Sequence, residues 1–483
     1  MTVRRRRRKR SPAIRCSTWK ASGVADRSVS LSATSARQKS EETTSVGLKR
    51  DRAKVVLPAP AGPTNTSSAS SGISIRTTAQ PIPTASTAIF SSMRPIKDEL
   101  QGTVDARRDA LVELSHRVHA ANEIRFEERR SSQMVADALA GAGFRVEMGV
   151  CDLETAFVAA AGSGPLTIGI CAEYDALPGI GHACGHNVIA AAAAGAGMAL
   201  ARVADDLGVT IRVLGTPAEE SGGGKILMLD RGAFDGVHAA MMVHPSPEER
   251  VHVDCLAVAH FQVRYHGKEA HASSYPELGL NAGDAVTVAQ VAIGLLRQHF
   301  NPYDQVHGIV VKGGEAPNIV PAHSVARFYV RARDMKALDL LRGRVNRCFD
   351  AGAMATGTRL DMEEESPPYS EFTPDLELGE IYRRNAEAIG RIFRSLPPRK
   401  SGSTDMANVS LRMPTIHPML EIEANGASNH QPEFTAACVT DSADRAVRDG
   451  ALAMALTVAD VASSSALRDR MLAGPTNHSS PAG

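Results

Sequence analysis

The most informative part of this sequence is the stretch Glu173-Tyr-Asp-Ala-Leu-Pro-Gly-Ile-Gly-His-Ala-Cys-Gly-His-Asn187. It follows an apolar, strand-like run at residues 166–171 and precedes a predicted helix over residues 187–207. The turn between them carries the thiol of Cys184 and the imidazole of His186, two residues apart, so both can face one ion. Because short spacings of this kind also occur by chance, a Gly-rich turn without a ligand is the alternative interpretation.

Further polar groups stand at the ends of other strand-like runs. One run leads to the adjacent acids Glu219 and Glu220, which repel each other unless a cation or a shared proton holds them. Another run ends at His244, and His430 lies in a late polar loop. Each histidine alone is more often a surface or satisfied core residue than a ligand. Taken with the turn before residue 187, these positions indicate a metal site.

The order of these motifs resembles a known family. Cys-x-His, Glu-Glu, His-Pro and a late His are similar to the two-domain co-catalytic metallopeptidases and amidohydrolases, which include aminoacylase, glutamate carboxypeptidase and the auxin-conjugate hydrolases. The quoted stretch most resembles the branch with the β-alanyl-lysine dipeptidase and the p-aminobenzoyl-glutamate hydrolase, and the likeness covers residues 96–461. It departs at Asn187, where many relatives of this branch have Asp.

The resemblance implies two divalent metal ions per subunit, zinc or manganese, and Glu219 as the general base. The implied metal ligands are Cys184, His186, Glu220, His244 and His430. The implied substrate contacts are His271, Asn318, Arg331 and Gly402. We expect Glu173 and Asp175 to orient the ligands. The alternatives are a purely structural role for these two acids and, for Arg331, an ordinary ion pair on a strand.

The implied reaction is hydrolysis of the amide bond of a dipeptide or an N-acyl amino acid, including substrates of the p-aminobenzoyl-glutamate type. Two other classes of protein stay open. A cysteine hydrolase would use Cys184 as nucleophile with His186 or His182 as base. A non-catalytic binding protein could share the fold, although the presence of Glu219 beside all five ligands favours an enzyme. No motif encodes the side-chain preference for the substrate.

Strands and helices alternate along most of the chain, which predicts an α/β fold with a mostly parallel sheet flanked by helices. A β-α-β-β-α-β order in the middle predicts an inserted α+β open-faced sandwich that serves as a lid and dimerisation domain. We therefore expect a catalytic domain in two parts, residues 93–258 and 367–465, an inserted domain at 259–366, and a flexible C-terminal tail at 466–483.

The first 92 residues differ in composition from the rest. They contain 17 Lys and Arg against 4 Asp and Glu, a net charge of +13, which leaves −12 for the remainder of a chain whose net charge is +1. The Ser, Thr, Ala and Pro content without a period predicts a disordered basic tail, or a native start at Met93. A nucleic-acid arm or a transit peptide is the alternative.

The composition of the 483-residue chain indicates the compartment in which the protein works and the kinds of partner it binds. No uninterrupted apolar run approaches the roughly 20 residues of a membrane span. Seven scattered cysteines, an odd number, favour a reducing compartment over a disulfide framework. We expect a cytoplasmic protein that binds a small amide substrate, forms a homodimer and has no nucleic-acid or membrane partner.

Overall fold

The structure is a computed structural model that describes residues 85–397 and 402–474, with side chains from Met93 onward. The predicted basic tail therefore lies outside the described residues up to position 84. The first described element, α1 (Ala85–Ala106), includes the expected boundary at residue 92. At the other end, α12 (Ser465–Leu472) occupies the first residues of the segment expected as the C-terminal tail. A bidentate ion pair from Arg470 to Asp375 and the buried Met471 hold α12 in place.

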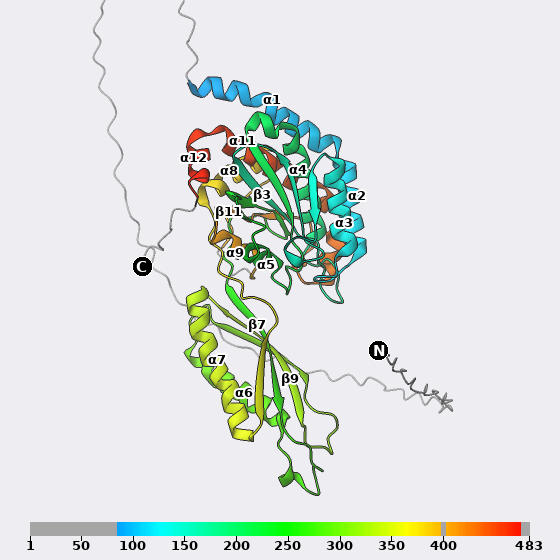
Figure 1. The fold of residues 1–483 in the computed structure, drawn as a ribbon, viewed down its shortest axis with the longest axis vertical. Coiled ribbons are helices and arrows are strands. Elements are labelled where there is room, and N and C mark those ends of the chain that lie inside the picture. Colours follow the sequence, from blue (N-terminus) through cyan, green and yellow to red (C-terminus); the bar gives the residue numbers. More distant parts are fainter. Residues whose placement is uncertain (1–84, 398–401, 475–483) are drawn as a thin grey trace, which may run out of the picture. The chain divides into compact units, whose positions relative to one another are not determined.

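A six-stranded sheet organises the larger part of the fold (Figure 1). Its order is β1-β2-β4-β3-β5-β11. The four strands β4, β3, β5 and β11 run parallel, while β1 and β2 pair antiparallel at one edge. The bounds are β1 (Arg145–Met148), β2 (Phe157–Gly162), β3 (Leu166–Ala172), β4 (Val209–Gly215), β5 (Ala239–Met241) and β11 (Thr415–Ile416). The predicted mostly parallel α/β sheet is confirmed.

The strand-like run that ends at His244 forms only the three-residue β5 in the six-stranded sheet. The chain then enters β6 (His244–Ser246), which leaves this sheet and pairs in parallel with β12 (Met419–Glu421). In this pairing Met419 lies opposite His244. The departure from the sheet places His244 just beyond the carboxyl end of β5.

Helices cover both faces of the six-stranded sheet. On one face α1, α4 and α11 lie side by side (Figure 1). After α1 the chain breaks at Arg107, whose φ of −102° and ψ of 2° are not helical, before the next helix begins. The remaining bounds are α2 (Arg108–Ala121), α3 (Arg129–Gly141), the 3-10 turn η1 (Val150–Asp152), α4 (His186–Leu207), α5 (Gly224–Asp230), α8 (Leu376–Ala388), α9 (Met406–Ser410), α10 (Pro432–Ala437) and α11 (Asp441–Ser463).

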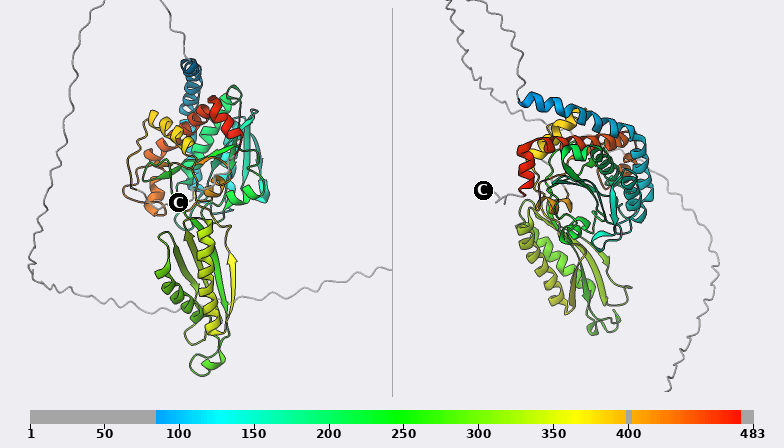
Figure 2. Two further views of the ribbon diagram at one scale, coloured as in Figure 1. Left: turned by 90° about the vertical axis from the view of Figure 1, so that its left-hand side faces the viewer. Right: turned by 45° about the horizontal axis from the view of Figure 1, so that its top comes forward.

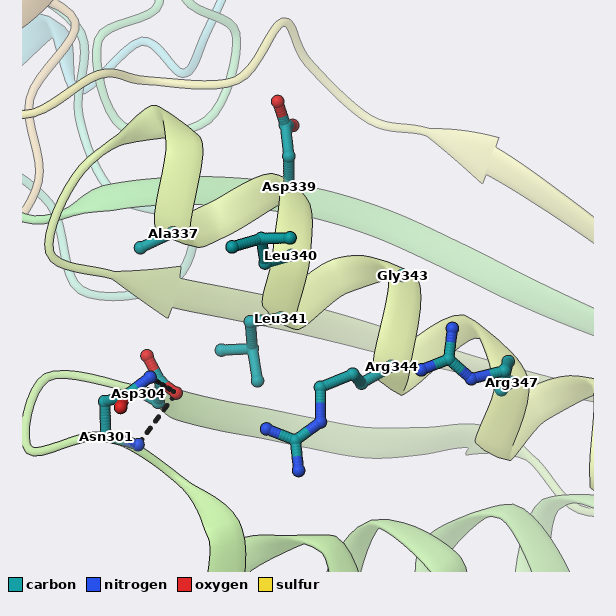
Figure 3. A pocket seen from close by; sticks show the side chains of 9 residues that line it. All are labelled: Asn301, Asp304, Ala337, Asp339, Leu340, Leu341, Gly343, Arg344 and Arg347. Atoms are coloured by element: carbon teal, nitrogen blue, oxygen red, sulfur yellow. Dashed lines mark hydrogen bonds between the residues drawn. The ribbon is translucent and has the colours of Figure 1, made fainter.

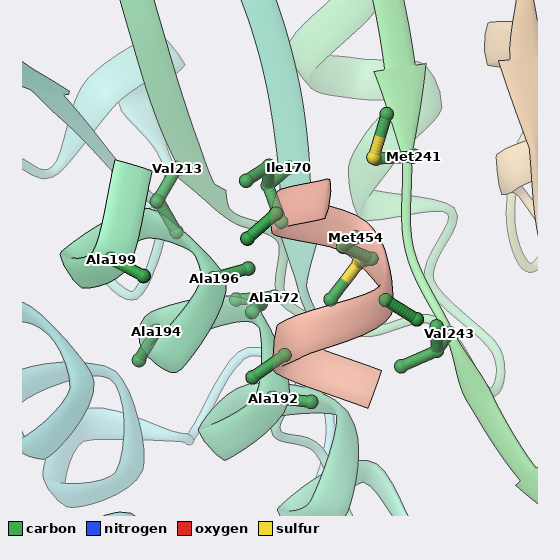
Figure 4. Packing of buried hydrophobic residues seen from close by; sticks show 14 of the residues in the cluster. Ile170, Ala172, Ala192, Ala194, Ala196, Ala199, Val213, Met241, Val243 and Met454 are labelled. Atoms are coloured by element: carbon green, nitrogen blue, oxygen red, sulfur yellow. The ribbon is translucent and has the colours of Figure 1, made fainter. Parts of the chain in front are cut away.

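Alanine-rich packing joins α4 to the sheet. Small side chains of α4 and Met454 of α11 contact Ile170, Val213 and Met241 of the strands (Figure 4). At Gly197 a Cβ would stand 2.6 Å from the Val213 side chain, so only glycine allows this close approach. Taken singly, α4 is the one described helix long and apolar enough to cross a membrane, but nearly all of it is buried in this core.

A second sheet is formed by the segment at residues 257–364, which we call the inserted segment. Its antiparallel order is β10-β7-β9-β8, and two long helices pack on the same face of it (Figures 1 and 2). This is the predicted open-faced sandwich. The bounds are β7 (Ala257–His266), η2 (Pro276–Leu278), α6 (Ala282–Leu296), η3 (Arg297–His299), β8 (Gln305–Lys312), β9 (His323–Ala332), α7 (Met335–Thr356) and β10 (Arg359–Glu364).

The inserted segment has a separate hollow of about 550 Å³ beside α7 (Figure 3). One wall is the loop in which Asp304 accepts hydrogen bonds from the backbone and side chain of Asn301. The other wall is the exposed side of α7, with Leu340, Arg344 and Arg347. Because no cysteine or histidine lines it, this hollow offers no site for a metal of the predicted kind.

Candidate active site and metal centre

A cavity of about 520 Å³ lies at the carboxyl ends of the parallel strands. This is where ligands bind in open α/β sheets. Its lining includes most of the side chains that the sequence predicts as metal ligands or base, and side chains of the inserted segment complete it. The residues of the first group are Cys184, Glu219, Glu220, His244 and His430, and those of the second are His260, Tyr329 and Arg331.

The turn after β3 carries Cys184, which lines this cavity, and His186, which is fully buried and is not part of the lining. Between them Gly185 has a φ of 79°, and a Cβ there would stand 2.3 Å from Pro245, so the turn requires glycine. His186 is the first residue of α4, and its Nδ1 lies 2.8 Å from the carbonyl oxygen and 3.0 Å from Oδ1 of Asp175. With Nδ1 donating to Asp175, the lone pair of Nε2 is directed away from it, toward the neighbouring carboxylates.

The loop after β4 carries both acids. Glu219 Oε2 lies 3.8 Å and Glu220 Oε1 4.0 Å from His186 Nε2. The loop begins at Ala218, which has a left-handed φ of 58°, unusual for a residue with a side chain. The backbone N–H of Glu220 donates to Asp175 Oδ2 at 3.1 Å. Asp175 thus orients both His186 and the loop.

Two groups of three possible ligands share Cys184. The first joins it to His186 and His244, and the second joins it to Glu220 and His430, with all ligand atoms of each group within 4.8 Å of one another. His244 Nε2 lies 3.3 Å from Cys184 Sγ, and His430 Nε2 lies 3.5 Å from Glu220 Oε2. All five predicted ligands therefore meet, from segments nearly 250 residues apart.

The charges at this site favour the binding of a cation. Burial, and then the Glu173 and Glu220 carboxylates, raise the pKa of Glu219 well above its usual value. Burial lowers the pKa of His244 to about 4, which keeps its imidazole neutral, as a metal ligand must be. His186 Nε2 and Glu220 Oε1 are buried without a hydrogen-bond partner in the described part of the chain. A thiol, imidazoles and carboxylates with unused lone pairs fit divalent metal ions.

Glu173 lies below the ligands and pairs with a residue that the sequence analysis missed. Its Oε2 is 3.3 Å from His186 Nε2, and its Oε1 is 2.6 Å from Lys225 Nζ. Lys225 Nζ also lies 2.7 Å from Asp405 Oδ1, and all three side chains are fully buried. The available signal was a lone lysine in the apolar start of α5, a residue type that is almost never buried unless paired.

His417 is a second residue that the sequence analysis missed. It lines the cavity and is only 2% exposed, and its ring centroid lies 5.4 Å from that of His244. Both of its ring nitrogens lack a hydrogen-bond partner among the described residues. Its His-Pro context matches that of His244, which was the only sequence signal for it.

The predicted substrate contacts divide into two pairs. Arg331 and Gly402 line the cavity, and Arg331 Nη1 donates to Ser403 Oγ at 2.5 Å. No carboxylate of the described residues forms an ion pair with Arg331, so its guanidinium can bind an anion. His271 and Asn318 are exposed, lie on adjoining stretches of the inserted segment and do not line the cavity of the same chain.

The cysteine-hydrolase alternative fits this geometry poorly. His182 Nε2 lies 3.1 Å from the Val118 carbonyl oxygen, to which it donates, and His182 does not line the cavity. Burial, and then the Glu220 carboxylate, raise the pKa of the Cys184 thiol well above its usual value. A thiol nucleophile needs the opposite shift.

The groups around Asn187 explain why this position has Asn and not the Asp that the resemblance implies. Its side-chain Nδ2 donates to Ser115 Oγ at 2.8 Å and to the Cys438 carbonyl at 2.9 Å. A carboxylate could not donate to the carbonyl, so the surroundings of this fully buried position suit an amide.

Comparisons with known proteins agree with this site. The sequence profile described as Peptidase family M20/M25/M40 matches residues 169–448. The Xaa-Arg dipeptidase of Mus musculus is 37% identical over 393 residues, which cover 78% of this chain and 91% of the relative. One of the subunits of the p-aminobenzoyl-glutamate hydrolase of Escherichia coli is 32% identical over 290 residues, or 56% of this chain and 60% of the relative.

Solved structures share the fold. A putative aminohydrolase of Staphylococcus aureus superposes with a TM-score of 0.61 at 20% identity, over 75% of this chain and 99% of its own. A protein of Bacillus subtilis described as a dinuclear metal-binding peptidase of the M20 family has a TM-score of 0.55 at 20% identity, over 74% and 99%. With the match to the family profile, these findings show that the chain belongs to peptidase family M20/M25/M40 and is a hydrolase of amide bonds.

Proposed function

We propose that the chain is a dinuclear metallo-dipeptidase that cleaves dipeptides or N-acyl amino acids with a free carboxylate on the leaving residue. The observation that carries the proposal is the pair of three-ligand groups that share Cys184. Together the residues of the two groups would hold two divalent ions. Zinc suits the thiol and imidazole ligands, and manganese is the second candidate because carboxylates are also present.

When bound, the ions would supply Lewis-acid polarisation of the amide carbonyl and lower the pKa of water. The residues of the chain would do the rest. Glu219, beside the ligands but not needed among them, would accept the proton of the attacking water and deliver it to the leaving nitrogen as the C–N bond breaks. Arg331 would hold the substrate carboxylate, since its guanidinium faces the cavity without an acidic partner among the described residues.

The exposed positions of His271 and Asn318 support a homodimer. In one chain they do not reach the cavity, so a second copy would have to bring them there. Strand β8 is the edge of its sheet and exposes Ile309, Val310 and Val311, an apolar edge of the kind that pairs with another strand. A cytoplasmic location remains our expectation from the cysteine content.

The test combines metal reconstitution with a substrate panel. A chelator should abolish activity, and zinc or manganese should restore it. His244→Ala and Cys184→Ser should each lower the metal content below two ions per chain, while Cys151→Ser, a free cysteine outside the cavity, serves as the control. Full metal content in both ligand variants would overturn the assignment.

The panel should contain dipeptides with C-terminal Arg or Lys, neutral dipeptides, N-acyl amino acids and p-aminobenzoyl-glutamate. We expect basic dipeptides to be the best substrates, because the mouse relative at 37% identity is a Xaa-Arg dipeptidase. Preferential cleavage of p-aminobenzoyl-glutamate would instead assign the chain to the second candidate activity.

A further inference from the structure

The loop that carries Glu219 is anchored by four side chains from three other segments of the chain. Glu128 accepts a hydrogen bond from the Ala218 N–H at 2.9 Å, and Arg125 donates to the Ser221 carbonyl at 2.7 Å. Asp175 accepts from the backbone of Glu220, as described above. The fourth anchor, Tyr369, is the only one that binds the backbone of Glu219 itself within the described residues.

Tyr369 makes two hydrogen bonds to this loop through one hydroxyl. The hydroxyl donates to the Glu219 carbonyl at 2.6 Å and accepts from the Gly223 N–H at 2.9 Å. It therefore joins both ends of the loop segment that contains the general base. The side chain is buried, with 2% of its surface exposed, so water does not replace these bonds readily.

The phenol ring is itself held firmly. The backbone of Tyr369 pairs with Val258 through two hydrogen bonds of 2.9 Å, at the point where the chain enters and leaves the inserted segment. The ring of His260 packs edge-on against it with centroids 5.1 Å apart, and the ring of Tyr329 packs on His260 at 4.2 Å. The position of the hydroxyl is thus fixed by both crossing strands and by the inserted segment.

We propose that Tyr369 is a positioning residue that sets the Glu219 carboxylate for proton transfer by holding its backbone. The proposal rests on the function proposed for Glu219. Since Ala218 is in a left-handed conformation, the loop needs such restraints to keep its shape. Loss of the hydroxyl would let the base move, and a displacement of about 1 Å at a catalytic group can cost roughly 100-fold in rate.

The test is Tyr369→Phe, which keeps the ring and removes the hydroxyl. We expect kcat to fall roughly 10- to 100-fold while KM stays within about twofold, with metal content and melting temperature unchanged. Tyr382→Phe is the matched control, because Tyr382 is fully buried in α8 and its hydroxyl has no hydrogen-bond partner among the described residues. A kcat equal to that of the control, or a loss confined to KM, would overturn the proposal.

A double-variant cycle separates positioning from other roles. If Tyr369 acts through Glu219, Tyr369→Phe should change kcat by less than about threefold once Glu219→Gln is present. If Tyr369→Phe lowers kcat by the same factor with and without Glu219→Gln, the proposal is overturned. A Glu219→Gln variant with unchanged kcat would instead overturn the proposed function, which is a different outcome. If Tyr369→Phe does not fold, Arg125→Ala, which frees the same loop at Ser221, has to show the same dependence on Glu219.

Discussion

Lys225 Nζ lies 2.6 Å from Glu173 Oε1, and both side chains are fully buried beneath the candidate metal centre. Burial opposes a charged lysine, but the Asp405 and Glu173 carboxylates outweigh it and raise the pKa of Lys225 well above its usual value. The ammonium therefore joins three segments of the chain: the end of β3, the start of α5 and the loop before α9.

Removal of this ammonium should be strongly destabilising. Lys225→Met would deprive the buried Asp405 and Glu173 carboxylates of the ammonium that they share, and breaking a buried ion pair typically costs about 3–5 kcal/mol. Urea unfolding with metal in excess measures the change in free energy of unfolding. Arg129→Met is the control, since its ion pair with Glu154 is exposed and should contribute little. A Lys225→Met protein as stable as the control variant would contradict the expected role of the pair.

Glu219 should matter for rate and not for metal binding. Glu219→Gln keeps the shape of the side chain but cannot accept a proton, so kcat should drop about 10²–10⁴-fold with KM and metal content retained. Glu220→Gln provides the contrast, because loss of a ligand should lower the metal content as well. Elemental analysis measures the metal content of both variants, and steady-state kinetics measure their kcat and KM. An unchanged kcat for Glu219→Gln would show that Glu219 is not the general base.

The sequence predicted those parts of the site that stand in local motifs. Cys184 and His186 are separated by one residue, and Glu219 follows a recognisable strand, so their chemistry was visible without a structure. Lys225, Tyr369 and His417 were missed because their partners lie 52, 150 and 173 residues away, at Glu173, Glu219 and His244. Long-range contacts of this kind leave no periodic pattern in a single sequence.

In the fold, too, the elements with a clear local sequence pattern were predicted and the others were not. The buried strand β3 was predicted almost to the residue, because a strand buried on both faces is a nearly continuous apolar run. The antiparallel edge strand β1 was not, because it has only four residues and three of them are exposed.

His260 should make the stability of the protein depend on pH. Burial, and then the Arg331 guanidinium, lower the pKa of His260 to about 3. Below its unfolded pKa of about 6.5 the unfolded chain binds a proton that the folded chain does not, so this contribution is complete above about pH 6.5 and is lost as the pH falls toward 3.

The variant His260→Asn isolates this effect. The free energy of unfolding of wild type relative to the variant should fall by about 2 kcal/mol between about pH 7.5 and about pH 5, as linkage requires for a group that takes up a proton only when unfolded. Urea unfolding of both proteins at the two pH values measures it. A difference that stays constant across the range would mean that folding does not shift the pKa of His260.

His271 should serve the active site of a partner subunit. It is exposed on the inserted segment and does not line the cavity of its own chain, whereas Arg331 does. In a two-fold dimer each cavity would then combine Glu219 of one chain with His271 of the other. The activity of the His271→Ala homodimer and that of the Glu219→Gln homodimer should each be at least about tenfold below that of wild type.

Complementation tests whether the two residues come from different chains. When the two variants are denatured together and refolded as an equal mixture, random pairing makes about half of the dimers hybrid, and each hybrid has one intact site of two, so activity should recover to roughly a quarter of wild type. The parents refolded separately are the controls for refolding yield. If His271 serves its own chain, no hybrid contains an intact site, and the mixture stays as inactive as its parents.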